Sequence, residues 1–360
     1  SDDQSIGLPS TNYGVAALQR RVFARSNIAA IFVNKQPVGF LSPESDSTQI
    51  NNWNRVAGLD YNLASLDNRW NGKIFYHHSF NSEKTQSPFA HGAEMRYNDG
   101  QWDLRWSHSI VGEDYNAEVG YIRRTGYKSI APEIGYDWYP SSRFINRHGP
   151  NLEYRGMWDM DNNKLDETIG LRYMIRFSEQ MTTFFSVNRE YIRLTEDFDP
   201  SRSEGPELPE GSDYTNYNTM FFIRSDIRRS FSFSASGSIG EYYNGNVARV
   251  SGMMNYRFRP YGLISMNYSF SKVSLPQPYN SANHYLVGPK LDITFTKTLY
   301  LATLVQYNSQ INNINVNARF QWRYKPASDI YLVYTDNYFA DVIKTKNRAL
   351  VFKITYWFNA

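Results

Sequence analysis

The chain has 360 residues, with 38 lysine and arginine residues against 35 aspartate and glutamate residues, and it contains no cysteine. A net charge of +3 is too small over this length to indicate a nucleic-acid-binding surface, and a chain without cysteine has no disulfide framework or thiolate metal site. Aromatic residues make up 16% of the chain, although hydrophobic residues make up only 41%. This mixture is typical of a β-barrel in lipid, which needs aromatic side chains at two interfaces and polar ones in its lumen. No run approaches 18 apolar residues, so no transmembrane helix is predicted.

Alternating segments follow one another along the chain, and the first predicted strand covers residues 11–23. Later segments alternate apolar and polar residues over about ten positions, a length that suits a tilted transmembrane strand better than an average globular one. They include residues 169–177, 248–258, 264–271 and 316–324. A soluble sandwich shows the same alternation because one face of each sheet is wet. The uniform length and the aromatic residues at strand ends, such as Tyr256 and Phe258, favour the barrel.

The last predicted strand covers residues 349–360, with the sequence ALVFKITYWFNA. Its period-two pattern places apolar side chains from Leu350 to Phe358 on one face and mixed ones on the other. This pattern resembles the closing strand of a bacterial outer-membrane β-barrel. We therefore predict an all-β fold, a large antiparallel transmembrane β-barrel.

The direction of this strand determines on which side of the membrane each connection between strands lies. With the C-terminus in the periplasm, the connections that lie inside are all short, and they are 66–68, 98–100, 178–181, 226–230, 259–262, 296–299 and 325–328. The outer ones are 34–52, 81–88, 193–214, 241–246, 272–284, 309–313 and 340–346, and they include the long loops. Long loops outside and tight turns inside are typical of outer-membrane barrels.

One stretch breaks this order. If residues 114–122 formed a spanning strand, every connection before them would lie on the opposite side of the membrane, and the long 34–52 loop would lie inside. Residues 110–127 are therefore predicted to be an inserted segment that enters or caps the lumen of the single domain 1–360. About 19 strands result, which places Ser1 on the external side. Single-chain bacterial barrels have even strand numbers, so we expect strands upstream of Ser1, one of which closes the barrel against residues 349–360. A miscounted strand is the alternative.

Several phrases resemble one family. They are TNYGVAALQRRVFARSNIAAIFVNKQ (11–36), DYNAEVGYIRR (114–124), YNGN (243–246) and LVQYNSQINNINVNARFQWRYKPASDIYLVYTD (304–336). They are similar to a poorly characterised family of Bacteroidota outer-membrane proteins, in which a C-terminal barrel usually follows a carbohydrate-binding-like module of the family-nine type. The resemblance covers essentially the whole chain and implies no established catalytic motif. It suggests a link to carbohydrate, but the module and the first barrel strands do not match any part of this sequence.

Charged side chains fall on the predicted lumen face. They are Arg105, Arg172, Arg176, Arg249, Arg257, Arg319, Arg323 and Lys353, with Asp60, Asp103, Glu133 and Asp137. One interpretation is a charged constriction that selects solutes. The alternative is that arginine–acid pairs cross-link a wet interior. Arg123 and Arg124 are predicted to pin the inserted segment to acidic residues of the wall.

Other chemistry has little support in the sequence. The six histidines show no metal spacing, and the adjacent His77 and His78 must point to opposite faces of a strand. Residues 159–166 lack the glycine and glutamate of a calcium loop and are predicted to form a hairpin turn. The acidic loop 196–213 is expected to be solvated. We predict no enzymatic activity, no metal and no cofactor.

These patterns predict an outer-membrane β-barrel that acts as a plugged or narrowed channel, or as a surface protein that captures a ligand. A non-transporting structural subunit of a larger outer-membrane complex is one alternative, and a barrel-type surface hydrolase is another. The expected partners are the lipid bilayer with its lipopolysaccharide outer leaflet and the chains of such a complex, and not nucleic acid.

Overall fold

The computed structural model describes residues 10–38, 53–82 and 85–358. Within these ranges the protein is all-β, with 20 strands that belong to one antiparallel sheet and no helix. The described part of the chain thus offers no helix that is long and apolar enough to cross a membrane. The prediction of an antiparallel all-β fold is confirmed.

The chain divides into two compact units. Unit 1 comprises Ser1–Trp138, Pro150–Leu171 and Tyr191–Arg193, and unit 2 comprises Tyr139–Gly149, Arg172–Glu190 and Leu194–Ala360. Unit 1 contains β1 (Thr11–Val22), β2 (Ser26–Pro37), β3 (Asn54–Ala64), β4 (Trp70–Asn81), β5 (Phe89–Asn98), β6 (Trp102–Val111), β7 (Tyr127–Ile130) and β8 (Glu133–Tyr136). Three strands contribute residues to both units, and they are β9 (Ile145–Trp158), β10 (Lys164–Phe177) and β11 (Thr182–Arg193).

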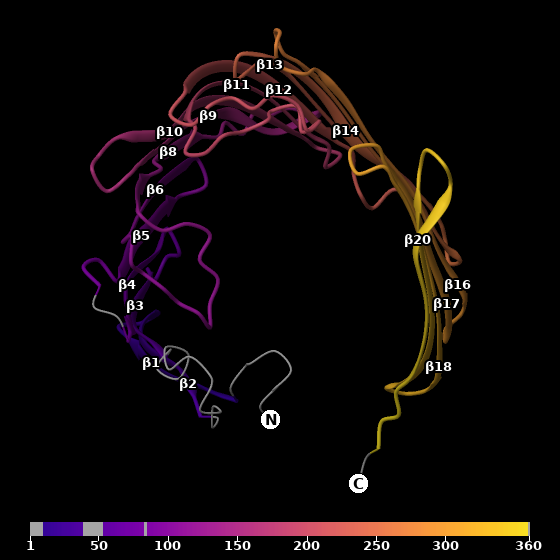
Figure 1. The fold of residues 1–360 in the computed structure, drawn as a ribbon, viewed down its shortest axis with the longest axis horizontal. Coiled ribbons are helices and arrows are strands. Elements are labelled where there is room, and N and C mark those ends of the chain that lie inside the picture. The colour runs from indigo at the N-terminus through magenta and orange to yellow at the C-terminus, as the bar shows by residue number, and fades with distance from the viewer. Residues whose placement is uncertain (1–9, 39–52, 83–84, 359–360) are drawn as a thin grey trace. The chain divides into compact units, whose positions relative to one another are not determined.

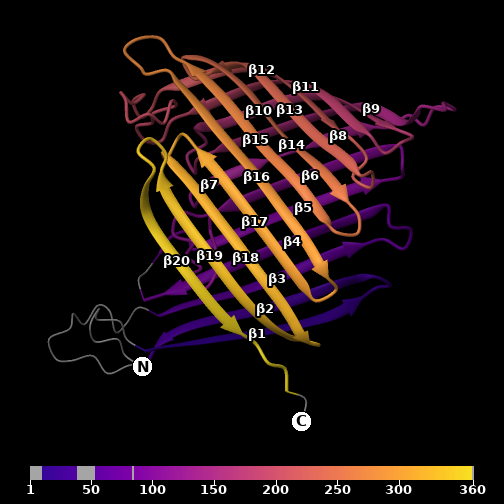
Figure 2. The ribbon, with the colours of Figure 1, turned by 90° about the vertical axis from the view of Figure 1, so that its right-hand side faces the viewer.

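Unit 2 contains the remaining strands. They are β12 (Asp213–Arg224), β13 (Phe231–Tyr242), β14 (Gly245–Phe258), β15 (Gly262–Ser274), β16 (Ala282–Thr296), β17 (Leu299–Asn308), β18 (Asn313–Lys325), β19 (Ser328–Phe339) and β20 (Lys344–Ile354). Strands adjacent in sequence pair in the sheet, as Figure 2 shows for β15 to β20. The turns between them are short, and Ala327 adopts a positive φ of 56° in the two-residue turn before β19.

The strand number differs from the predicted count of about 19. The additional strand arises because β7 and β8 follow one another in the place of a single strand, each pairing with β6 on one side and β9 on the other. The break lies at Ala131 and Pro132, and proline has no N–H to donate to the ladder. The 20 strands therefore fill 19 positions.

The C-terminal strand also differs from its predicted bounds. It begins at Lys344 and ends at Ile354, whereas the alternation predicted residues 349–360. Its partner strand β19 begins at Ser328, directly after the turn. The C-terminal strand therefore has no partner backbone beyond the hydrogen bonds between Thr355 and Asp329. Alternation alone does not reveal where the partner strand ends. The final two residues of the prediction lie outside the described part of the chain.

Residues 112–126 form neither strand nor helix. They connect β6 to β7, and Figure 1 shows this loop lying to one side of β3, β4 and β5. Tyr115 packs in the loop against Ala90 and Val111, with Phe75 and Ile122 beside them. The loop occupies residues 112–126 of the predicted inserted segment 110–127, whose end residues Ile110, Val111 and Tyr127 belong to β6 and β7, and its entry into a lumen stays a prediction.

The sheet of unit 1 has an apolar face and a polar face. The apolar face exposes large side chains, among them Leu59, Ile74, Trp106 and Ile134, each between 44% and 61% exposed. The polar face buries Asn54 and Ser79, each 1% exposed, beneath the 112–126 loop. This arrangement is the reverse of a soluble protein, where apolar side chains form the core and polar ones meet solvent.

Unit 2 follows the same rule. Its apolar face carries exposed side chains such as Val250, Met254, Leu332 and Phe352. Its polar face carries Arg249, the buried Ser265, and a ladder of amides in which Asn315 donates to Asn337 over 2.8 Å and Asn337 donates to Asn347 over 2.7 Å.

Candidate functional site

The 112–126 loop of unit 1 is held to the polar face by partly buried hydrogen bonds. The Asn54 side chain donates to the Asn116 carbonyl over 3.0 Å and accepts from the Glu118 N–H over 3.3 Å. The Ser79 hydroxyl accepts from the Asn116 N–H over 3.1 Å. Lys35 forms an ion pair with Glu118. Three residues, one each on β2, β3 and β4, therefore fix the position of the loop through Asn116 and Glu118.

The loop entrance is also fixed. The Asp114 carboxylate accepts from the N–H groups of Gln86 and Ser87 over 2.9 and 3.0 Å. The hydrogen bonds that the backbone N–H groups of Ser87 and Gln86 donate hold the pKa of the Asp114 carboxyl below its usual value. The charged form of this side chain therefore stabilises the start of the loop.

Arg123 and Arg124 lie at the far end of the same loop, and both are exposed. The Arg124 guanidinium lies 3.8 Å from the Met157 sulfur and interacts electrostatically with Asp166. A further ion pair, between Lys35 and Glu118, links the loop to β2, and the role of Arg123 and Arg124 in pinning the loop stays a prediction. Sequence reasoning missed Lys35, Asn54 and Ser79 because nothing in a strand pattern indicates which polar residue lies beneath a distant loop.

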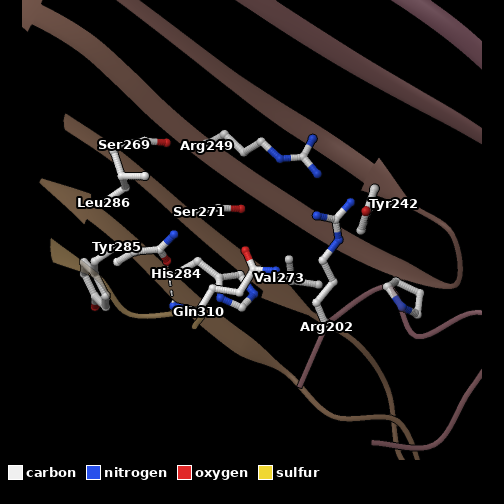
Figure 3. Close-up of a pocket in the computed structure, with 12 residues that line it drawn as sticks. Arg202, Tyr242, Arg249, Ser269, Ser271, Val273, His284, Tyr285, Leu286 and Gln310 are labelled. Carbon is white, nitrogen blue, oxygen red and sulfur yellow. Dashed lines mark hydrogen bonds between the residues drawn. The ribbon is translucent and has the colours of Figure 1, made fainter. Parts of the chain in front are cut away.

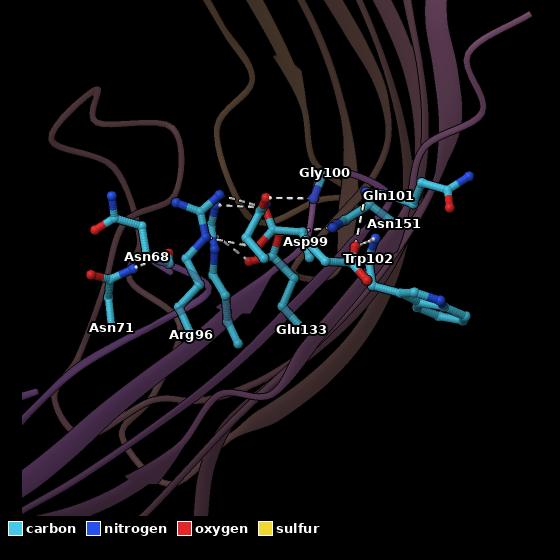
Figure 4. Close-up of polar contacts among 12 residues, drawn as sticks. Asn68, Asn71, Arg96, Asp99, Gly100, Gln101, Trp102, Glu133 and Asn151 are labelled. Atoms are coloured by element: carbon cyan, nitrogen blue, oxygen red, sulfur yellow. Dashed lines mark hydrogen bonds and ion pairs between the residues drawn. The ribbon is translucent and has the colours of Figure 1, made fainter. Parts of the chain in front are cut away.

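A chain of charged side chains crosses the polar face from β5 to β9. Arg96 donates two hydrogen bonds to the Asp103 carboxylate, over 2.7 and 2.6 Å, and Arg105 lies 3.3 Å from the same carboxylate. Arg105 also pairs with Glu133 over 3.5 Å, and Glu133 accepts from the Asn151 amide over 2.8 Å. Figure 4 shows Arg96, Glu133 and Asn151 in this cluster. Positive and negative charges here compensate one another.

The remaining predicted lumen residues are scattered over the polar faces. Asp60 pairs with Lys73 and with His77, both over 2.9 Å, and Arg323 pairs with Asp329 over 3.2 Å. Arg257 donates to the Ile227 carbonyl, and Arg172 lies over the Phe184 ring. Asp137 follows β8 and donates its N–H to the Gln101 carbonyl. Arg176 lies on β10, Arg319 on β18 and Lys353 on β20. Most of these residues therefore belong to separate local contacts.

In the loop 194–212 of unit 2, one carboxylate accepts several hydrogen bonds from neighbouring residues. The Asp199 carboxylate accepts from the Ser201 N–H and hydroxyl over 2.8 and 2.6 Å, and from the N–H groups of Ser203 and Gly205 over 2.8 and 3.3 Å. Burial by itself raises the pKa of Asp199, but these hydrogen bonds outweigh it, so the pKa lies below its usual value. Leu208, 1% exposed, anchors the same loop. Most side chains of this stretch, such as Glu196, Glu204 and Glu207, are exposed, as expected of a solvated loop, and internal hydrogen bonds shape its backbone around Asp199.

This loop lies against β16 and the turn before it. His284 donates from Nε2 to the Ser201 carbonyl over 2.8 Å, and the Asn280 amide donates to the Ser203 hydroxyl over 3.2 Å. A Cβ on Gly205 would lie 2.4 Å from the Asn280 amide nitrogen, so any larger residue at this position would displace the Asn280 side chain. These contacts place Arg202, at a φ of 52°, at the edge of the polar face.

A cavity of about 340 Å³ opens between the loop and the polar face of β14 to β17. Its lining includes Arg202, Tyr242, Arg249, Ser269, Ser271 and His284. Figure 3 shows the guanidinium groups of Arg202 and Arg249 pointing into the same space. The Arg249 guanidinium lies 4.8 Å from the centre of the Tyr242 ring. Of the predicted lumen residues, Arg249 is the one that lines this cavity.

One acid lies on the apolar face of unit 2. Asp336 is 0% exposed and accepts from the hydroxyls of Tyr334 and Tyr338, over 2.6 and 2.5 Å, and from Arg348 over 2.7 Å. All three donors bind Oδ2 of this carboxylate, which compensates the buried charge on that oxygen, while Oδ1 is buried without a hydrogen-bond partner among the described residues.

The described residues hold no group of three or more histidine, aspartate or glutamate side chains arranged to bind a metal ion. A comparison with curated proteins finds no sequence match to this chain. A family model, described as a domain of unknown function (DUF5916), matches residues 2–279. Because this match covers most of the 360 residues, the chain belongs to the DUF5916 family.

Proposed function

We propose that this protein is an outer-membrane β-barrel whose polar face lines a narrowed lumen, where it passes or captures a polar solute. The observation that carries the proposal is the inverted distribution of side chains, with exposed apolar faces and buried polar residues in both units. Such a distribution is stable when lipid covers the apolar face. Strands of 10 to 15 residues, as in β5 and β16, suit a tilted span of the bilayer.

A row of aromatic side chains supports the same proposal. On the apolar face of unit 1, Trp70 contacts Tyr97 at 4.9 Å between ring centres, and Trp102 contacts Tyr136 at 4.8 Å. Trp138 continues the row at 5.0 Å from Tyr136. All lie next to the short turns at one end of the strands. Tryptophan and tyrosine are enriched at membrane interfaces because their rings prefer that mixed environment.

Two adjacent methionines on β14 provide a matched test. Met254 lies on the apolar face and is 47% exposed, whereas Met253 lies on the polar face and is 40% exposed. In lipid, Met254→Arg is expected to lower the free energy of unfolding by about 2 kcal/mol, because arginine on a lipid-facing surface costs this much at depth. Met253→Arg is expected to change it by less than about 0.5 kcal/mol. Urea unfolding in lipid vesicles measures both.

Equal effects of the two substitutions would contradict the membrane proposal, since two similarly exposed methionines in water tolerate arginine equally. Conductance in planar bilayers then tests the channel. Asn54→Ala, which loosens the 112–126 loop, is expected to raise the conductance of the full chain, with Asn71→Ala on the exposed end of β4 as the control. A barrel that inserts but never conducts, even without residues 114–127, would favour a non-transporting subunit.

A further inference from the structure

Two arginines in the cavity of unit 2 have no acidic partner. Among the described residues, neither Arg202 nor Arg249 lies within ion-pair distance of a carboxylate. The acid three positions before Arg202 is Asp199, and its carboxylate is engaged by the Ser201, Ser203 and Gly205 donors of its own loop. Two like charges therefore face the same cavity without compensation.

The loop holds the two arginine charges near one another, and their repulsion raises the electrostatic energy of the folded protein. The contacts of Ser201 with His284 and of Ser203 with Asn280 bring Arg202 to the cavity that Arg249 lines. Like charges brought together repel, and an anion between them turns the repulsion into two charge-assisted hydrogen-bonding interactions. Arginine is suited to this role because its planar fork binds carboxylate and phosphate groups through two parallel hydrogen bonds.

The rest of the lining suits a hydroxylated molecule. Within the described chain, the hydroxyls of Ser269 and Ser271 and the Gln310 side chain have no protein hydrogen-bond partner, and all three line the cavity. The Tyr242 ring adds an apolar surface beside Arg249. A volume of about 340 Å³ lies at the lower end of the range for small-molecule sites, which start near about 300 Å³.

We propose that this cavity binds a small hydroxylated organic anion, whose carboxylate or phosphate group lies between Arg202 and Arg249. The proposal rests on the proposed function in one respect, since it names the class of solute that the polar face captures. Binding itself requires neither insertion into lipid nor conduction.

The test is isothermal titration calorimetry on the full chain in a non-ionic detergent. Glucose, glucuronate and glucose 6-phosphate share the same sugar ring and differ in the group at carbon 6, so they separate the contribution of the anion and distinguish carboxylate from phosphate. Both anions or one of them is expected to bind at least about tenfold more tightly than glucose. Equal binding of all three, or no binding of any, would overturn the proposal.

Two variants assign the site. Arg249→Gln is expected to weaken binding of the preferred anion at least about tenfold, and Arg249→Lys, which keeps the charge but not the fork, is expected to weaken it less. Arg257→Gln is the control, since Arg257 lies on the same strand and face about 26 Å away, at about 3.3 Å per residue. A loss with Arg257→Gln equal to that with Arg249→Gln would place the anion elsewhere. If the protein binds the anion but Met254→Arg does not change the free energy of unfolding in lipid, the membrane proposal is refuted and the anion site stands.

Discussion

Arginine has opposite surroundings in two regions of this protein. On the polar face of unit 1, Arg96 and Arg105 share the Asp103 carboxylate, and Arg105 reaches Glu133. In the cavity of unit 2, Arg202 and Arg249 have no carboxylate partner among the described residues, and the nearby Asp199 binds its own loop. The first region is a cross-linked wall, and the second presents charge to a ligand. The number of arginines and acids in a sequence therefore does not reveal which arginines are free of an acidic partner and can bind a ligand.

Asp103→Asn should have the largest effect on stability. The substitution removes the negative charge that separates Arg96 from Arg105, so two like charges remain on the face without their shared acid. Because these side chains are partly exposed, we expect a loss of about 2 kcal/mol rather than that of a fully buried pair. Urea unfolding measures it. Arg249→Gln is the comparison and should change the free energy of unfolding by less than about 0.5 kcal/mol. A larger loss for Arg249→Gln would show that this charge too is structural.

Asn54→Ala should have an intermediate effect that is local to unit 1. The side chain is 1% exposed and holds both Asn116 and Glu118, so its loss removes a partner from the Asn116 carbonyl and from the Glu118 N–H. We expect about 1 kcal/mol of destabilisation and several-fold faster cleavage by trypsin after the exposed Arg123 and Arg124. Lys73→Gln, which removes a charge at a separate pair, should leave the cleavage rate unchanged. Unchanged cleavage of the Asn54→Ala variant would show that other contacts hold the loop.

The smallest effect should be the acid sensitivity of the loop 194–212. A carboxyl group whose pKa is lowered by folding stabilises the fold above its unfolded pKa of 3.8 and loses this contribution as the pH falls through the lower folded value. Hydrogen exchange of the Ser203 and Gly205 amides, corrected for intrinsic rates, should therefore accelerate as the pH falls below about 3.8. Asp199→Asn should accelerate it at neutral pH.

The turn at Asp226 is an internal control for this measurement. Arg228 holds the pKa of Asp226 at about 2 through a side-chain hydrogen bond, so this turn should keep its protection to a lower pH than the loop does. Simultaneous loss of protection at both places would indicate global unfolding instead of a local effect of Asp199.

Much of the fold was predictable because it depends on local patterns. Alternation in segments such as 248–258 identified the strands and assigned Arg249 and Arg257 to one face and Met254 to the other, and the registers of β14 agree. The ends of strands were less predictable. Residues 349–360 alternate to the end, yet β20 stops at Ile354 because its partner turns away. Pro132 splits one strand position into β7 and β8, which changed the count.

Period-two alternation and turn residues were enough to predict the class of fold and the two faces of each strand, and the sides of the connections pointed to the segment 110–127, of which residues 112–126 form no strand. The contacts of Asn54, Ser79 and Lys35 with that loop were visible only in the folded protein, as was the cavity that Arg249 shares with Arg202 while Arg105 is paired. The reason is physical. Such contacts join residues tens of positions apart, so they depend on the register of the strands and on how a loop lies over the sheet. The local alternation of apolar and polar residues specifies neither.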